Sequence, residues 1–218
     1  MFESNKGQFF PLSDSAPRRS TPILTISLIV LNVLVFIWSL TDFENIISKY
    51  GFVPAYASIL TIFTSMFLHG GLDHIFGNMW YLWIFGDNVE DALGRIKFLI
   101  LYFLSGISAA FLQYLTDPTS TIPSIGASGA ISGVLGAYLL LFPKENVLTS
   151  VQYSLVRVPA YLVIGLWFVL QLIFGTMSLA GYSGSNIAFW AHVGGFVFGL
   201  AFAFLFVDRK KQKIGLEL

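Results

Sequence analysis

Six long apolar segments alternate with polar segments along the chain. A helix needs about 20 apolar residues to cross a bilayer, so each segment is predicted to be a transmembrane helix. The stretch 41–70 is too long and too amphipathic for a tight turn, and we expect a partly embedded first loop with short helices. The pattern predicts an all-α membrane protein, a six-helix bundle with segments near 22–40, 72–88, 96–116, 127–142, 158–177 and 187–207.

Polar segments are predicted to flank a single membrane domain. Residues 1–20 are rich in Ser and Pro and contain Arg18-Arg19, which indicates a flexible polar tail. Residues 21–208 hold all six apolar segments and form the membrane domain. Residues 209–218 begin with three consecutive basic residues and are predicted to be a basic tail.

The composition supports a membrane protein and excludes several kinds of chemistry. Hydrophobic residues make up 56% of the chain and charged residues 11%, against about 25% charged residues in soluble domains. The formal net charge is zero, so no nucleic-acid partner is indicated. No cysteine is present, which excludes a disulfide, a thiolate nucleophile and a thiolate metal site. We expect no metal and no cofactor.

The Lys and Arg residues indicate the orientation, because cytoplasmic loops carry an excess of them. With a cytoplasmic N-terminus, six spans return the C-terminus to the cytoplasm, and only Lys49 falls outside. We therefore expect a cell-membrane protein with both termini in the cytoplasm and the loops 41–70, 117–125 and 178–186 outside. The eleven basic residues inside are Lys6, Arg18, Arg19, Arg95, Lys97, Lys144, Arg157, Arg209, Lys210, Lys211 and Lys213.

Four polar residues lie near the outer face in this topology. Ser128 opens the fourth segment, and His192 lies about one helical turn into the sixth. His74 and Asn78 open the second. These three segments all run from outside to inside, so the four side chains are expected at similar depth. Polar groups at membrane depth are costly and usually face the bundle interior or a water-filled cavity.

Ser128 and His192 are predicted to form a catalytic dyad. A serine hydroxyl is a weak nucleophile until a base within hydrogen-bond reach takes its proton, and neutral histidine is the usual base. The fourth and sixth segments contain no acidic residue, so a third, histidine-orienting carboxylate is not available from them. A two-member dyad is therefore favoured over a triad.

Hydrogen-bond donors and small residues surround the predicted dyad. His74 and Asn78 are four residues apart on one helical face, and both can donate to a developing oxyanion. The backbone N–H groups near Ser128 are free if a helix begins there. Supporting glycines are expected to keep the approach to the serine open and to let the fourth and sixth segments pack closely. They are Gly126, Gly129, Gly195 and Gly199.

Simpler interpretations exist for single motifs. The string Gly126 to Ala130 is also typical of helix packing, and a membrane histidine can belong to a proton path. His69 fits either a functional residue or an interfacial loop residue. Glu90 and Asp91 are expected, with Arg95, to form a solvated or interfacial turn. The joint placement of the four polar residues favours catalysis.

In this order, the motifs resemble those of the rhomboid family of intramembrane serine proteases. The resemblance covers about residues 50–207. It rests on His69-x4-His74-x3-Asn78, Glu90-x3-Gly94, Gly126-x-Ser128-Gly129 and Ala191-His192-x2-Gly195-x3-Gly199.

The resemblance implies a Ser128 nucleophile, a His192 base and an oxyanion site formed by His74, Asn78 and Ser128. It also implies a water-accessible cavity open to the outside, gated and capped by the fifth span and the loop 178–186. The substrates would be single-span membrane proteins in the lipid bilayer, cut near the outer face.

Two features depart from the family pattern. The Trp-Arg pair that many members carry in the first loop does not occur. Many members also place an aromatic residue four positions after the serine, where it stacks on the base, and here that residue is Ser132. His192 is then either positioned by another aromatic residue or held less tightly. Neither change removes a reacting group, so activity is still expected.

Two other functions compete with a protease. A catalytically silent rhomboid-like protein would bind membrane clients, but it would need neither Ser128 nor His192. A small transporter could use His74 and His192 in a proton path. The third to sixth segments carry no clear carboxylate, and no internal repeat is visible, which disfavours a transporter.

Overall fold

The computed structural model describes residues 10–151, 154–182 and 187–206. Six long helices occupy the six predicted segments: α1 (Ile23–Ser39), α4 (Leu72–Leu93), α5 (Arg95–Thr116), α6 (Ser128–Leu141), α7 (Ala160–Leu179) and α8 (Phe189–Phe206). The predicted basic tail 209–218 and residues 183–186 of the predicted loop 178–186 lie outside the described residues.

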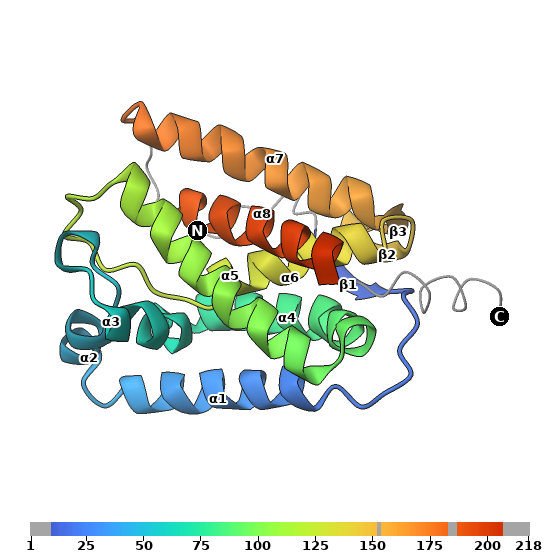
Figure 1. The fold of residues 1–218 in the computed structure, drawn as a ribbon, viewed down its shortest axis with the longest axis horizontal. Helices are drawn as coiled ribbons and strands as arrows, with labels where there is room; N and C mark the ends of the chain where they lie inside the picture. Colours follow the sequence, from blue (N-terminus) through green and yellow to red (C-terminus); the bar gives the residue numbers. More distant parts are fainter. Residues whose placement is uncertain (1–9, 152–153, 183–186, 207–218) are drawn as a thin grey trace.

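Helix α6 forms the centre of the bundle and packs against α8, α5 and α4. Almost every residue of α6 is buried, as expected for a helix that is apolar on all sides. Helices α1 and α7 lie at opposite edges of the molecule (Figure 1). Helix α7 packs against α8, α6 and the strands near its N-terminus.

Not all six helices are long enough to count as spans by length and hydropathy. Among the described residues, α5, α7 and α8 meet both criteria. Helix α4 and the short helices before it would add one span if they are counted together, although they meet at a 90° bend. Helices α1 and α6 are apolar but shorter, at 17 and 14 residues. Six spans therefore remain a prediction, whereas the described residues form a largely helical protein with three or four candidate membrane spans.

The segment 41–70 contains short helices, as predicted. They are α2 (Phe43–Tyr50), η1 (Pro54–Tyr56), α3 (Ile59–Thr64) and η2 (Ser65–Phe67). Several large apolar side chains of this segment are exposed, including Tyr56, Ile59 and Leu60. Backbone hydrogen bonds between Phe52 and Ser124 attach it to the chain that leads into α6.

The prediction of a purely helical protein was wrong for three strands: β1 (Phe10–Asp14), β2 (Asn146–Val151) and β3 (Ser154–Pro159). They form an antiparallel sheet in the order β1-β2-β3. Strands β2 and β3 are rich in β-branched residues, which favour extended backbone, but each is too short to stand out between two apolar helices. Strand β1 is a weak strand former whose pairing partner lies over a hundred residues away.

Residues 10–20, predicted to be part of a flexible tail, are held by hydrogen bonds from side chains of α4 and α6. The indole of Trp80 donates to the Pro11 carbonyl at 2.7 Å, and Asn88 Nδ2 donates to the Ala16 carbonyl at 2.9 Å. The Tyr138 hydroxyl donates to Asp14. Burial raises the pKa of Asp14 to about 6; the nearby Asp87 adds to this shift and the Tyr138 hydroxyl opposes it.

Glu90 is buried, so the predicted solvated or interfacial turn is wrong for this residue. Its side chain is only 2% exposed. The carboxylate accepts hydrogen bonds from the Leu24 and Thr25 N–H groups at 3.0 and 2.8 Å and from the Thr25 hydroxyl at 2.8 Å. These N–H groups belong to the first turn of α1, where no intrahelical acceptor exists. Glu90 therefore joins α4 to the start of α1.

Candidate active site

Ser128 is the first residue of α6, and the preceding loop holds it close to α4. Gly126 has φ +125°, a conformation that other residues rarely adopt, and its N–H donates to the Ser65 carbonyl at 2.9 Å. A Cβ atom on Gly126 would lie 2.7 Å from His74 Nε2 and 3.6 Å from Asn78 Nδ2. Glycine at this position therefore lets the chain pass directly over the two side chains.

His192 reaches Ser128 from the first turn of α8. Its Nε2 lies 2.8 Å from Ser128 Oγ, a hydrogen-bonding distance. This approach depends on close packing of α6 and α8, where a Cβ atom on Gly195 would collide with the Gly129 carbonyl oxygen. A Cβ atom on Gly199 would collide with the Gly133 carbonyl oxygen in the same way.

His74 and Asn78 present hydrogen-bond donors beside this pair. His74 Nδ1 accepts a hydrogen bond from the Gly70 N–H at 3.2 Å, so the proton of the neutral ring is on Nε2, the atom that faces Gly126. Asn78 Nδ2 is buried and has no hydrogen-bond partner among the described residues. A buried donor without a partner calls for an explanation, and a transient oxyanion would supply the missing acceptor.

The structure also brings in two residues that the sequence analysis missed. Gln171 Oε1 of α7 lies 2.9 Å from His192 Nδ1, and the Trp167 ring lies one turn earlier, 5.9 Å from the His192 ring between centroids. The signal for Gln171 was a polar residue inside an apolar helix. Ser132 does not take the place of the missing aromatic residue, since its hydroxyl donates to the Ser128 carbonyl at 2.6 Å.

His69, for which a functional role and a place in an interfacial loop were both open, is fully buried in the protein. Its ring meets His74 edge-on, with centroids 5.1 Å apart and planes at 67°. His69 thus contacts the group that presents a donor near Ser128. Among the described residues, no group of three or more His, Cys, Asp or Glu could hold a metal ion.

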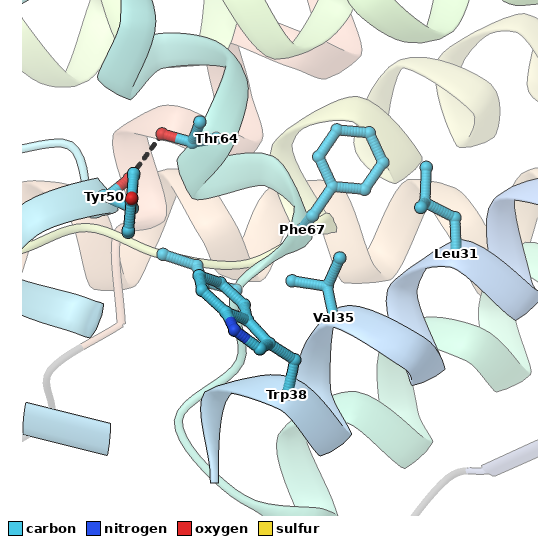
Figure 2. Close-up of a pocket in the computed structure, with 7 residues that line it drawn as sticks. Leu31, Val35, Trp38, Tyr50, Thr64 and Phe67 are labelled. Atoms are coloured by element: carbon cyan, nitrogen blue, oxygen red, sulfur yellow. Dashed lines mark hydrogen bonds between the residues drawn. The ribbon is translucent and has the colours of Figure 1, made fainter. Parts of the chain in front are cut away.

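A pocket of about 320 Å³ lies apart from these residues, between α1 and the first loop (Figure 2). Within it, the Thr64 hydroxyl donates to the Tyr50 carbonyl at 2.7 Å. The lining is mostly apolar and includes none of the candidate catalytic residues. It consists of Leu31, Val35, Trp38, Tyr50, Thr64, Phe67 and Leu68.

Comparison with known proteins identifies the family. Residues 56–209 match the family model described as Rhomboid domain. The protein named "Putative rhomboid protease YdcA" of Bacillus subtilis is 28% identical over 200 residues, which are 89% of this chain and 94% of YdcA. Mitochondrial rhomboid protein 1 of Saccharomyces cerevisiae is 30% identical over 202 residues, 87% of this chain and 56% of that protein.

A second Bacillus subtilis protein named as a rhomboid protease matches a shorter part of the chain. Rhomboid protease GluP of Bacillus subtilis is 31% identical over 140 residues, which are 63% of this chain and 24% of GluP. The chain thus spans nearly all of YdcA, but about half of the yeast protein and a quarter of GluP. Because the family model covers more than half of the chain, this protein belongs to the rhomboid family.

Proposed function

We propose that this protein is an intramembrane serine endopeptidase with a Ser128–His192 dyad. The observation that carries the proposal is the 2.8 Å distance between Ser128 Oγ and His192 Nε2, which joins two helices far apart in sequence. A nucleophile and a base within hydrogen-bond reach are the minimum that acyl transfer requires. The names of related proteins, such as rhomboid protease GluP, agree with this activity.

The reaction follows from the positions of the side chains. Ser128 Oγ transfers its proton to His192 Nε2 and bonds to the carbonyl carbon of the scissile peptide. The carbonyl oxygen becomes an oxyanion, which would accept hydrogen bonds from Asn78 Nδ2, His74 Nε2 and the free N–H groups at the start of α6. His192 then gives its proton to the leaving amine as the C–N bond breaks. A water molecule, deprotonated by His192, then attacks the acyl carbon; the bond to Ser128 Oγ breaks, and His192 returns the proton to Oγ.

The substrates we propose are single-span membrane proteins cut near the outer membrane face. Helix α6 has 14 residues, or about 21 Å of helix, against a hydrocarbon core of about 30 Å. If its C-terminal end reaches the cytoplasmic interface, Ser128 lies several Å below the outer surface. A cut at that depth requires a substrate whose backbone enters the bilayer. The basis for the outer side is the distribution of Lys and Arg.

Labelling of the purified protein with a serine-directed phosphonate tests the proposal. The wild-type protein should be labelled stoichiometrically, whereas Ser128→Ala removes the nucleophile and His192→Ala removes its activation. Ser132→Ala is the matched control, because Ser132 is buried one turn later in α6 and its hydroxyl is bonded to a backbone carbonyl. The Ser132→Ala protein should still be labelled.

Cleavage of a single-span substrate in detergent or liposomes completes the test. The three variants should behave in cleavage as they do in labelling. A wild-type protein that reacts with neither reagent nor substrate would instead support a silent client-binding protein. Persistent labelling of Ser128→Ala would mean that another serine is the nucleophile.

A further inference from the structure

Gln171 is the one polar side chain among the buried residues of α7. The others are Ala160, Val163, Ile164 and Gly175. Burying a side-chain amide among apolar groups is costly unless it is hydrogen-bonded. The Gln171 side chain is 8% exposed, and its Oε1 lies 2.9 Å from His192 Nδ1. The partner of this amide is thus the proposed catalytic base.

The hydrogen bond determines which nitrogen of His192 carries the proton. An amide oxygen can only accept, so His192 Nδ1 must donate to it. In a neutral imidazole the other nitrogen, Nε2, then has a free lone pair. This is the nitrogen that lies 2.8 Å from Ser128 Oγ. The opposite tautomer would point an N–H at the serine and could not take its proton.

Helix α7 also supplies a ring beside the base. Trp167 precedes Gln171 by one turn, and its ring is tilted by 34° to the His192 ring. The position four residues after Ser128 in α6 holds no aromatic residue; it is Ser132, whose hydroxyl donates to the Ser128 carbonyl. The contacts that hold the base therefore come from α7.

We propose that Gln171 is the positioning residue of the catalytic base, which extends the dyad to Ser128–His192–Gln171. This inference rests on the proposed serine-protease function. Gln171 does not touch the substrate or the reacting atoms; it holds His192 in the tautomer and orientation that accept the Ser128 proton. A neutral amide fulfils this role at membrane depth without the cost of a buried carboxylate.

Three variants of Gln171 test the assignment. Gln171→Leu keeps most of the volume but removes the acceptor, and Gln171→Met is a second variant with a poor acceptor in case the first does not fold. Both should lower kcat and the rate constant of phosphonate labelling by about 10- to 100-fold, with little change in KM. Gln171→Glu keeps an acceptor of the same reach and should recover part of the lost rate.

The pH profile separates positioning from simple packing. A carboxylate beside Nδ1 favours the charged imidazole, so the acid limb of the kcat/KM profile should move to higher pH in Gln171→Glu. A residue at position 171 that packs away from Nδ1 would not move this limb, so the shift, read together with the rates of Gln171→Leu and Gln171→Met, tests the contact with the base. Leu170→Ala is the matched control, because Leu170 is the preceding residue of α7 and its side chain is exposed. It should keep the wild-type rate and profile.

Each outcome has a separate meaning. A reactive wild-type protein with Gln171→Leu and Gln171→Met at the wild-type rate would overturn the Gln171 assignment alone. A Gln171→Glu protein as slow as Gln171→Leu, with an unmoved acid limb, would do the same. A wild-type protein that does not react with the phosphonate would overturn the proposed function and this inference together.

Discussion

Two asparagines on helix α4 should separate catalysis from stability. Asn78 Nδ2 is buried without a partner among the described residues, whereas Asn88 Nδ2 donates to the Ala16 carbonyl at 2.9 Å. If Asn78 stabilises the oxyanion, Asn78→Ala should lower kcat by about 10- to 1,000-fold, or roughly 1.4 to 4 kcal/mol of transition-state stabilisation. The lower end applies if His74 and the backbone N–H groups share the load.

The thermal stability of the two variants should show the reverse order: Asn88→Ala, and not Asn78→Ala, should be destabilised. Asn78→Ala breaks no hydrogen bond of Nδ2 in the resting protein and removes a buried, unpaired donor, so Tm should stay unchanged or rise. Asn88→Ala leaves the Ala16 carbonyl unpaired, at a cost of about 1–2 kcal/mol, which lowers Tm by roughly 2–8 °C in a chain of this size. Its kcat should stay within about twofold of wild type.

The assay is cleavage of a single-span substrate in detergent, together with thermal unfolding of the same preparations. The informative quantity is kcat with KM nearly constant, because an oxyanion contact strengthens only in the transition state. An Asn78→Ala protein that cleaves at the wild-type rate would refute the oxyanion role. A loss confined to KM would place Asn78 in substrate binding instead.

Three further predictions concern stability and topology. The folded protein holds the proton of Asp14 up to about pH 6 and the unfolded chain loses it near pH 4, so wild type should lose stability across this range as pH rises. Asp14→Asn should therefore have the higher Tm at about pH 8 and no advantage at about pH 4; the reverse order would refute this. Glu90→Gln should lower Tm by several degrees, because one amide oxygen cannot accept all three hydrogen bonds; an unchanged Tm would be contradictory. In this cysteine-free chain, Thr119→Cys should react with an impermeant thiol reagent on intact cells and Ser154→Cys should not; the opposite labelling would invert the proposed orientation.

Features that depend on local composition could be predicted from the sequence. The six long helices coincide with the six apolar segments, because an apolar run reports directly on a membrane environment. The Ser128–His192 contact was expected from depth alone, since both residues lie near the start of helices with the same predicted direction. Their catalytic role stays a prediction.

Features that depend on long-range pairing could not be predicted. Strand β1 gains its strand conformation from β2, whose residues pair with it as Phe10 with Ser150 and Asp14 with Val147. Glu90 lies in a charged stretch of sequence that is typical of a surface turn. Its burial and its role as a hydrogen-bond acceptor depend on the position of α1, which the sequence does not reveal. Gln171 lies among apolar neighbours in sequence, and its partner is on another helix.

The small sheet restricts how the chain can be threaded through a membrane. Hydrogen-bonded strands must lie on the same side of a bilayer, so the chain between β1 and β2 must cross it an even number of times. Counting only α5, α7 and α8 as spans leaves one crossing in this interval and separates the strands. Two crossings, by α4 and α5, or four, by α1, α4, α5 and α6, keep them together. An odd number of crossings would keep β1 from reaching β2, so protection of residues 10–14 from protease would report that the number of crossings between them is even.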